Sequence, residues 1–226
     1  MGEVADRLAL VRERLARACD RAGRDPARVR LVAVSKTKPP EVVREAYEAG
    51  QRDFGESYAQ ELRDKARELS ELPNLRWHFI GRLQTNKARY VAPVASLVHA
   101  VDSEGLAREL ARRAGSRALP CLLEVNVAGE RQKGGVAPAA AEELARAVRA
   151  LPPLALRGLM TIPPAGEPAA PHFARLRRLR EELSSALGEP LPELSMGMSE
   201  DFEEAIAEGS TIVRVGSAIF GPREAR

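Results

Sequence analysis

Short runs of aliphatic residues recur about every thirty residues along the chain, and polar or glycine-containing segments separate them. Runs of this kind, rich in Val, Ile and Leu, are typical of parallel strands that are buried on both faces. The pattern predicts eight strands, over residues 30–35, 52–56, 77–81, 97–102, 121–127, 157–162, 193–198 and 211–216.

The segments between these strands carry the periodicity of helices. In residues 103–115, Leu106 and Leu110 lie four positions apart and therefore share one face. Ser103 stands at the expected N-cap, and Gly115 follows the last periodic residue. Similar patterns predict helices over residues 39–50, 138–151, 172–188 and 199–209, the last opening on Ser199, and an N-terminal helix over about residues 2–23.

Strands that alternate with helices pair in parallel, and eight such units predict a closed α/β barrel of the (β/α)8 or TIM type. We expect a single barrel domain over residues 1–226, preceded by the extra N-terminal helix, with the proline-rich residues 161–172 forming a loop. The alternative is an open doubly wound sheet, but no G-x-G-x-x-G turn follows the first strand. On the third strand, His78 is expected to point inward as a hydrogen-bonded core residue, while Trp77 and Phe79 pack under helices.

Composition and charge narrow the classes of function. Acidic and basic side chains are mixed along the helices and the formal net charge is only +3, so no nucleic-acid partner is expected. The first helix is charged throughout and no run is long enough to span a bilayer, which predicts a cytoplasmic protein without a membrane partner. Cys19 and Cys121 are expected to be buried free thiols. The histidines and cysteines lack metal-ligand spacing, so no metal site is expected.

In barrels of this type the functional site lies at the carboxyl ends of the strands. The seventh strand ends in SMGMSED and the eighth in VRVGSAIFG, so each runs through glycine to serine before a helical turn. Ser199, Gly216 and Ser217 therefore form a candidate phosphate site, where hydroxyls and the amides of a helix start would meet the anion. The alternative is that both serines only cap helices.

Lys36 follows the first strand, in VAVSKTKPP, across the barrel mouth from this candidate phosphate site. Lysine is scarce, with five lysines against 30 arginines, so each lysine is informative. A desolvated amine can form a Schiff base with a carbonyl, and an amine opposite a phosphate site is what pyridoxal 5′-phosphate (PLP) requires. The alternatives are a solvated lysine or one that clamps a phosphorylated sugar. Lys38, just before the prolines, is expected to be solvated.

Alternation along the eighth strand directs Arg214 away from Val213 and Val215 and into the barrel. An inward arginine needs a partner, which is either a buried ion pair with a residue such as Glu124 or Asp102, or the pyridine nitrogen of PLP. In the second case the permanently charged guanidinium would keep that nitrogen unprotonated. The ring would then be a poorer electron sink, which disfavours carbanion chemistry.

Seven segments, namely LVAVSKTKP, DFGESYAQE, WHFIGRLQTNK, EVNVAGERQKGG, RGLMTI, SMGMSEDFEEAI and VRVGSAIFG, together resemble the YggS/PROSC family of PLP homeostasis proteins, from about residue 28 to residue 222. The resemblance implies a barrel like the N-terminal domain of alanine racemase, with PLP held as a Schiff base on Lys36. It also implies buffering of PLP or its delivery to apo-enzymes, without established catalysis and so without catalytic residues. The cofactor-binding set that it implies is Lys36, Ser57, Met198, Ser199, Arg214, Gly216 and Ser217.

Two residues add detail to this resemblance. The family usually has FGEN where this chain has FGES, so Ser57 replaces an asparagine that resembles a contact near the cofactor ring. We expect PLP binding to survive this change, because the covalent bond and the phosphate contacts remain. Lys133, after the fifth strand, is either a transient acceptor for PLP or a mobile loop lysine.

Two other functions fit parts of the pattern. A PLP-dependent amino-acid racemase needs bases on both faces of the substrate carbon, and in alanine racemase the second is a tyrosine from an additional domain of a dimer. This chain ends after the eighth strand, and Tyr47, Tyr58 and Tyr90 lie on or beside helices, so a monomeric carrier is expected. An aldolase acting on sugar phosphates would use Lys36 on its substrate and would hold no coloured cofactor.

Overall fold

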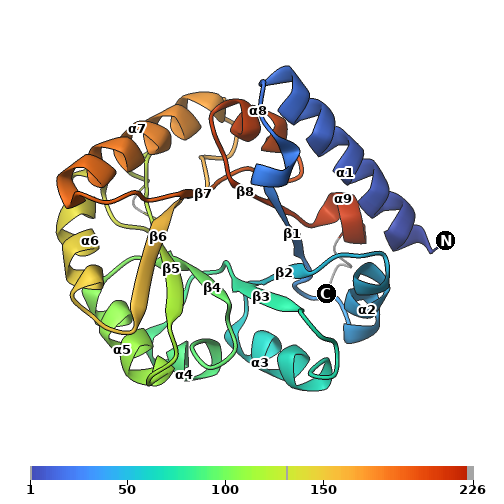
Figure 1. The fold of residues 1–226 in the computed structure, drawn as a ribbon, viewed down its shortest axis with the longest axis horizontal. Coiled ribbons are helices and arrows are strands. Elements are labelled where there is room, and N and C mark those ends of the chain that lie inside the picture. The colour runs from blue at the N-terminus through green and yellow to red at the C-terminus, as the bar shows by residue number, and fades with distance from the viewer. Residues whose placement is uncertain (1, 131, 223–226) are drawn as a thin grey trace.

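The computed structural model describes residues 2–130 and 132–222; residue 1, residue 131 and residues 223–226 of the expected 1–226 domain lie outside them. Within the described residues, eight parallel strands close into a barrel in the order of the sequence (Figure 1). The predicted (β/α)8 architecture is therefore confirmed. The strands are β1 (Arg30–Val34), β2 (Asp53–Glu56), β3 (Arg76–Phe79), β4 (Leu97–Val101), β5 (Leu119–Glu124), β6 (Leu154–Met160), β7 (Glu193–Ser195) and β8 (Ile212–Val215).

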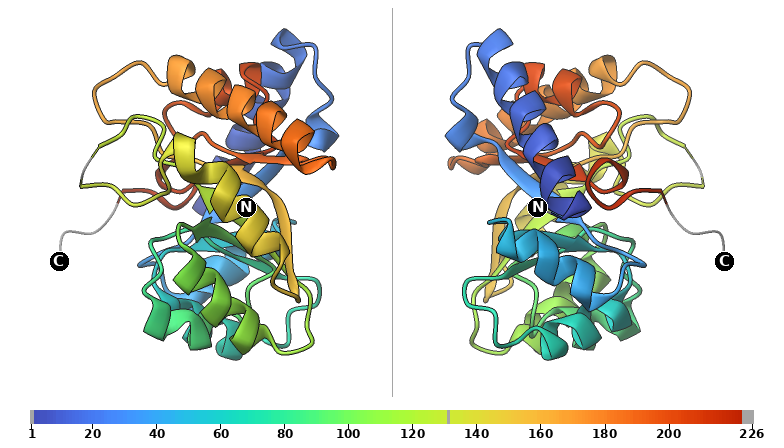
Figure 2. Two further views of the ribbon diagram at one scale, coloured as in Figure 1. Left: turned by 90° about the vertical axis from the view of Figure 1, so that its left-hand side faces the viewer. Right: turned by 90° about the vertical axis from the view of Figure 1, so that its right-hand side faces the viewer.

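Helices surround this barrel, as Figures 1 and 2 show. The N-terminal helix α1 buries Val4, Leu8, Val11 and Leu15 on one face, a spacing that follows the helical period. Helix α1 packs against α8 and α9, outside the seam where the first and last strands pair. The helices are α1 (Glu3–Arg21), α2 (Pro40–Glu48), α3 (Ala59–Glu68), α4 (Ala88–Val91), α5 (Glu104–Ala114), α6 (Ala141–Arg149), α7 (Ala170–Leu187), α8 (Phe202–Ala207) and α9 (Ser217–Phe220).

The segment after β7 differs from the prediction. Strand β7 ends at Ser195, three residues early, and helix α8 begins at Phe202 instead of opening on Ser199. Gly197 has φ 95°, a left-handed conformation that ends the strand, and Asp201 accepts a hydrogen bond from the amide of Met198 at 2.6 Å. Met198 and Ser199 therefore lie in a turn, and Ser199 is not the N-cap of a helix.

The apolar core has two parts, one outside the strands and one inside the barrel. Trp77 and Phe79 belong to the larger cluster between strands and helices, as predicted. A smaller cluster fills the interior with the side chains of Val32, Leu97, Ala100, Leu122, Met160 and Ile212. Cys19 and Cys121 are buried free thiols, as expected. No helix of the described residues is long and apolar enough to cross a membrane, and none of their His, Cys, Asp and Glu side chains form a group suited to a metal ion.

Candidate functional site

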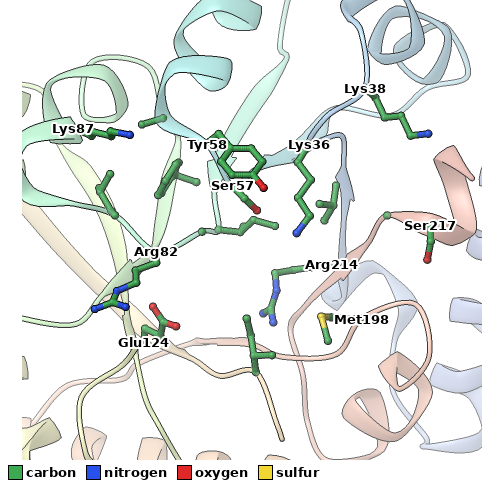
Figure 3. Close-up of a pocket in the computed structure, with 18 of the residues that line it drawn as sticks. Lys36, Lys38, Ser57, Tyr58, Arg82, Lys87, Glu124, Met198, Arg214 and Ser217 are labelled. Atoms are coloured by element: carbon green, nitrogen blue, oxygen red, sulfur yellow. The ribbon is translucent and has the colours of Figure 1, made fainter. Parts of the chain in front are cut away.

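A cavity of about 1230 Å³ lies at the carboxyl ends of the strands, where the barrel rule places a site. Its lining includes all seven residues that the sequence suggested for a cofactor, and Figure 3 shows part of this lining. These residues come from the segments after β1, β2, β7 and β8, and from β8 itself. The sequence prediction thus brought together residues that share one cavity: Lys36, Ser57, Met198, Ser199, Arg214, Gly216 and Ser217.

Lys36 stands two residues beyond the end of β1 and is half-buried. Its side chain extends into the cavity toward Arg214, with the ring of Tyr58 beside it (Figure 3). Strand β1 pairs with β8 on one side and β2 on the other, so its end is fixed by two neighbours. Lys36 therefore lies close to the end of a strand that is paired on both sides.

Ser199 and Ser217 meet on the wall formed by the last two strands. The hydroxyl of Ser217 donates to that of Ser199 at 3.2 Å, although the two residues belong to different loops. Gly216 precedes the one-turn helix α9, and a Cβ at this position would lie 3.2 Å from the carbonyl oxygen of Val34. Glycine thus allows the end of β8 to sit against β1, which brings the hydroxyl pair to the same rim as Lys36.

Arg214 is buried, with 3% of its surface exposed, and points into the barrel as alternation predicted. Its guanidinium donates to the hydroxyl of Ser195 at 2.6 Å and to the carbonyl of Thr161 at 3.0 Å. Burial lowers the pKa of Arg214 to about 10, so the group stays charged at neutral pH. Its hydrogen bonds go to neutral groups, and the alternative of a direct ion pair with Glu124 or Asp102 is wrong for the described residues.

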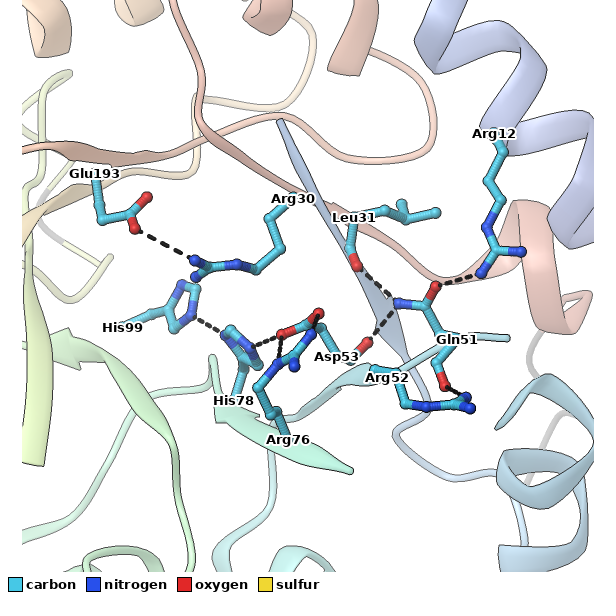
Figure 4. A network of polar contacts seen from close by, with 10 residues as sticks. All are labelled: Arg12, Arg30, Leu31, Gln51, Arg52, Asp53, Arg76, His78, His99 and Glu193. Carbon is cyan, nitrogen blue, oxygen red and sulfur yellow. Dashed lines mark hydrogen bonds and ion pairs between the residues drawn. The ribbon is translucent and has the colours of Figure 1, made fainter. Parts of the chain in front are cut away.

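A chain of buried polar groups continues behind Arg214, and Figure 4 shows most of it. His99 bonds to Ser195 at 2.8 Å and to His78 at 2.9 Å, and His78 bonds to Asp53 at 2.9 Å. Burial lowers the pKa of both histidines, so both rings are neutral at pH 7. The prediction that His78 is a hydrogen-bonded core residue is confirmed, whereas the sequence offered no argument for His99.

Asp53 anchors the far end of this chain. Burial by itself would raise the pKa of Asp53, but hydrogen bonds from Arg76 and His78 hold it well below its usual value. The ionised carboxylate accepts a hydrogen bond from Nε2–H of His78, which leaves Nδ1 of that ring to accept one from Nε2–H of His99. His99 Nδ1 then accepts from Ser195, whose oxygen accepts from Arg214. The charge of Asp53 therefore fixes which atom donates in each hydrogen bond, and the last acceptor, Ser195, orients the guanidinium of Arg214.

Other cavity residues escaped the sequence reasoning. Tyr58 lies at the start of α3, as predicted, but its exposed ring also lines the cavity. Lys38, expected to be solvated, is half-buried on the cavity wall and donates to the carbonyl of Pro222 at 3.0 Å. The position of Lys38, two residues after Lys36, was the only sequence signal that it also lines the cavity. Arg82 and Glu124 lie side by side on another wall in Figure 3, and burial raises the pKa of Glu124.

Lys133 does not line the cavity in the described structure. Its amine forms an ion pair with Glu130 at 2.6 Å and donates to the carbonyl of Pro163 at 3.0 Å. These contacts tie the loop after β5 to the loop after β6. Lys133 therefore bonds to both loops in this conformation.

The fold and site define an eight-stranded α/β barrel in which a lysine amine and a hydroxyl-lined glycine turn share one cavity. The family described as "Alanine racemase, N-terminal domain" matches residues 7–224. A pyridoxal phosphate homeostasis protein of Pseudomonas aeruginosa is 52% identical over 99% of this chain and 97% of its own length. One from Aquifex aeolicus is 47% identical over 97% and 98%. The chain belongs to the family of pyridoxal phosphate homeostasis proteins.

Solved structures agree with this assignment. PipY of Synechococcus elongatus, solved with PLP bound, is 39% identical and superposes with a TM-score of 0.84, covering 96% of this chain and all of its own. Its structure without PLP gives 41% identity and a TM-score of 0.87, with the same coverage of both chains. Alanine racemase from Corynebacterium glutamicum is only 18% identical, with a TM-score of 0.70 over 99% of this chain and 62% of its own, and shares the fold alone.

Proposed function

We propose that this chain binds PLP in the cavity at the strand ends, with Lys36 as its covalent attachment point. PLP supplies an aldehyde, which condenses reversibly with a primary amine and releases water, and a phosphate that requires hydrogen-bond donors. The donor set fits both groups, because the amine of Lys36 and the hydroxyls of Ser199 and Ser217 line one cavity. That shared lining is the observation that carries the proposal.

The remaining residues have roles that follow from their chemistry. The hydroxyl pair of Ser199 and Ser217, with the turn at Gly216, would grip the phosphate. Ser57 and Met198 would flank the ring. Arg214 would face the pyridine nitrogen, where a guanidinium has protons to donate and accepts none, so that nitrogen stays an acceptor.

We propose that the protein acts as a carrier that buffers PLP and delivers it to apo-enzymes, and that it works as a cytoplasmic monomer. A charged Arg214 disfavours protonation of the pyridine nitrogen, and an unprotonated ring withdraws electrons weakly from a bound amino acid. The site therefore suits holding and releasing PLP better than carbanion chemistry. Mixing loaded protein with the apo-form of a PLP-dependent enzyme should restore its activity, and activity that fails to return would count against delivery.

Attachment at Lys36 is tested by colour and by trapping. Protein reconstituted with PLP should be yellow, and borohydride should fix PLP to the peptide that contains Lys36. Lys36→Ala should lose the trapped adduct, whereas Lys87→Ala, which removes another amine from the same cavity, should keep it. A wild-type protein that stays colourless with excess PLP, or an adduct on another lysine, would contradict the proposal.

One observation favours amino-acid racemisation as a second candidate. Tyr58 lines the cavity next to Lys36, so a phenol and an amine are both within the site. Tyr58 is 56% exposed, however, which leaves its phenol open to exchange with solvent instead of isolated for a stereospecific transfer. Turnover of alanine that is lost in Tyr58→Phe, while PLP binding persists, would establish the racemase instead of the carrier.

A further inference from the structure

A buried ion cluster lies directly behind Lys36. Lys65 of α3 is only 4% exposed, and its amine donates to the carbonyl of Ser35 and to Oε1 of both Glu56 and Glu61, each at 2.7 Å. An ammonium group has three protons to donate, so all three are used. Glu56 is completely buried at the end of β2. Buried charges persist only when they are paired in this way.

The same cluster holds both neighbours of Lys36. On the preceding side, the carbonyl of Ser35 accepts from Lys65, and the hydroxyl of Ser35 donates to Glu56 at 2.7 Å. On the following side, the amide of Thr37 donates to Oε1 of Glu61 at 2.7 Å. Lys36 is therefore the middle residue of a three-residue turn whose two ends are attached to one buried cluster.

The turn itself is strained at Thr37. This residue has φ 65°, in the left-handed region that β-branched residues rarely adopt. Such a conformation persists only where the surroundings impose it, and it is found preferentially at functional sites. Two described contacts hold this geometry. The amide of Lys38 donates to the carbonyl of Ser35 at 3.0 Å and closes the turn, and the amide of Thr37 donates to Glu61. The bond to Glu61 is the one that attaches the Thr37 side of the turn to the cluster.

We propose that Lys65, with Glu56 and Glu61, is a positioning residue that fixes the turn of residues 35–37 and so directs the amine of Lys36 into the cavity. The proposal rests on the proposed role of Lys36 as the attachment point for PLP. Lys65 does not react with the aldehyde, because its amine is buried and bonded to three acceptors. The buried Lys65 thus sets the position of Lys36, whose amine lies in the cavity.

The simplest test removes one arm of the cluster. Glu61→Ala deletes the acceptor of the Thr37 amide, and Glu68→Ala removes an exposed glutamate from the same helix as a matched control. Without PLP, hydrogen exchange of the Thr37 amide should accelerate about tenfold or more in Glu61→Ala, the effect expected for one hydrogen bond to a charged group. Limited labelling with an amine reagent should show an altered rate at Lys36 and unchanged rates at Lys87 and Lys133. With PLP, trapping at Lys36 should slow by a similar factor.

A second pair of variants separates positioning from stability. Lys65→Met leaves Glu56 and Glu61 without the amine that bonds to both and is expected to unfold more easily, whereas Lys65→Met combined with Glu56→Gln replaces the fully buried carboxyl with a neutral amide. If the cluster positions Lys36, the double variant should regain thermal stability but not the rate of PLP capture. If the cluster only stabilises the fold, capture should recover together with stability.

Two results would overturn the inference. One is a folded Glu61→Ala variant whose Thr37 exchange, Lys36 labelling and PLP capture all equal those of Glu68→Ala. The other is recovery of capture in the double variant. A wild-type protein that does not trap PLP at Lys36 would refute the proposed function instead. Hydrogen exchange of Thr37 and labelling of Lys36, both measured without PLP, would still test whether the cluster positions the turn.

Discussion

Glu56 offers a quantitative test of the electrostatics beside the site. Its carboxylate is completely buried, and Oε2 has no hydrogen-bond partner among the described atoms. Burial raises the pKa of Glu56 to about 7 from a model-compound value of 4.5, despite the nearby charge of Lys65. The folded chain therefore keeps a proton on Glu56 between pH 4.5 and 7, where the unfolded chain has lost it.

The sign and size of the effect follow from this difference. Because the folded state binds the extra proton in this window, its free energy of unfolding falls as the pH rises from 4.5 to 7. At about 1.4 kcal/mol for each pKa unit, the loss reaches about 3 kcal/mol above pH 7. Glu56→Gln has no proton to lose at this position, so the variant should lack this component of the pH dependence.

Urea unfolding of both proteins without PLP, measured from pH 4 to pH 8, tests the reasoning. The free energy of unfolding of Glu56→Gln, minus that of the wild type, should rise with pH by about 3 kcal/mol. Subtracting the two curves removes the contributions of groups that titrate equally in both proteins. Parallel curves across this range would refute the buried, proton-retaining carboxyl.

Three further predictions concern two residues of the cavity and Asp53, at the far end of the buried polar chain. Gly81→Ala should weaken PLP binding and lower the melting temperature, because a Cβ at this position would lie 2.3 Å from the carbonyl oxygen of Ser57. A PLP titration and a thermal scan measure the two effects. An unchanged affinity would mean that PLP binding does not depend on the position of Ser57. Ser57→Asn, which introduces the asparagine expected from the family resemblance, should tighten PLP binding about fivefold in a PLP titration, as one added neutral hydrogen bond would. Asp53→Asn should reduce the fall in the free energy of unfolding below pH 3.8, measured by urea unfolding. The depressed pKa of Asp53 stabilises the wild type, and this stabilisation is lost as acid protonates the carboxylate. Equal acid sensitivity of the two proteins would argue against the Arg76 and His78 contacts.

The parts of the fold that the sequence predicted well depend on local patterns. Aliphatic runs located every strand to within a few residues, and their number and alternation with helices led to the closed barrel. The rule that sites gather at strand ends placed Lys36 and Ser217 at the same end of the barrel, and both line one cavity there. These inferences succeed because burial on both faces and barrel closure are strong constraints on sequence.

The parts that were missed depend on contacts between distant segments. Ser199 resembles an N-cap in sequence, but the turn at Gly197 and the carboxylate of Asp201 move the helix start to Phe202. The bond between His99 and Ser195 joins residues on β4 and β7, and nothing local to either residue indicates it. Lys65 lies in a helix rich in charged residues and gives no local sign that its amine is buried against Ser35.

The seam between β1 and β8 has a consequence for how the protein becomes functional during synthesis. The strand that carries Lys36 is among the first to leave the ribosome, and the strand that leads to Ser217 is the last. A nascent chain that stops short of β8 possesses the amine but neither the Ser217 hydroxyl nor the edge that completes the ring. The proposed PLP site would therefore be complete only after β8 has paired with β1 and closed the barrel.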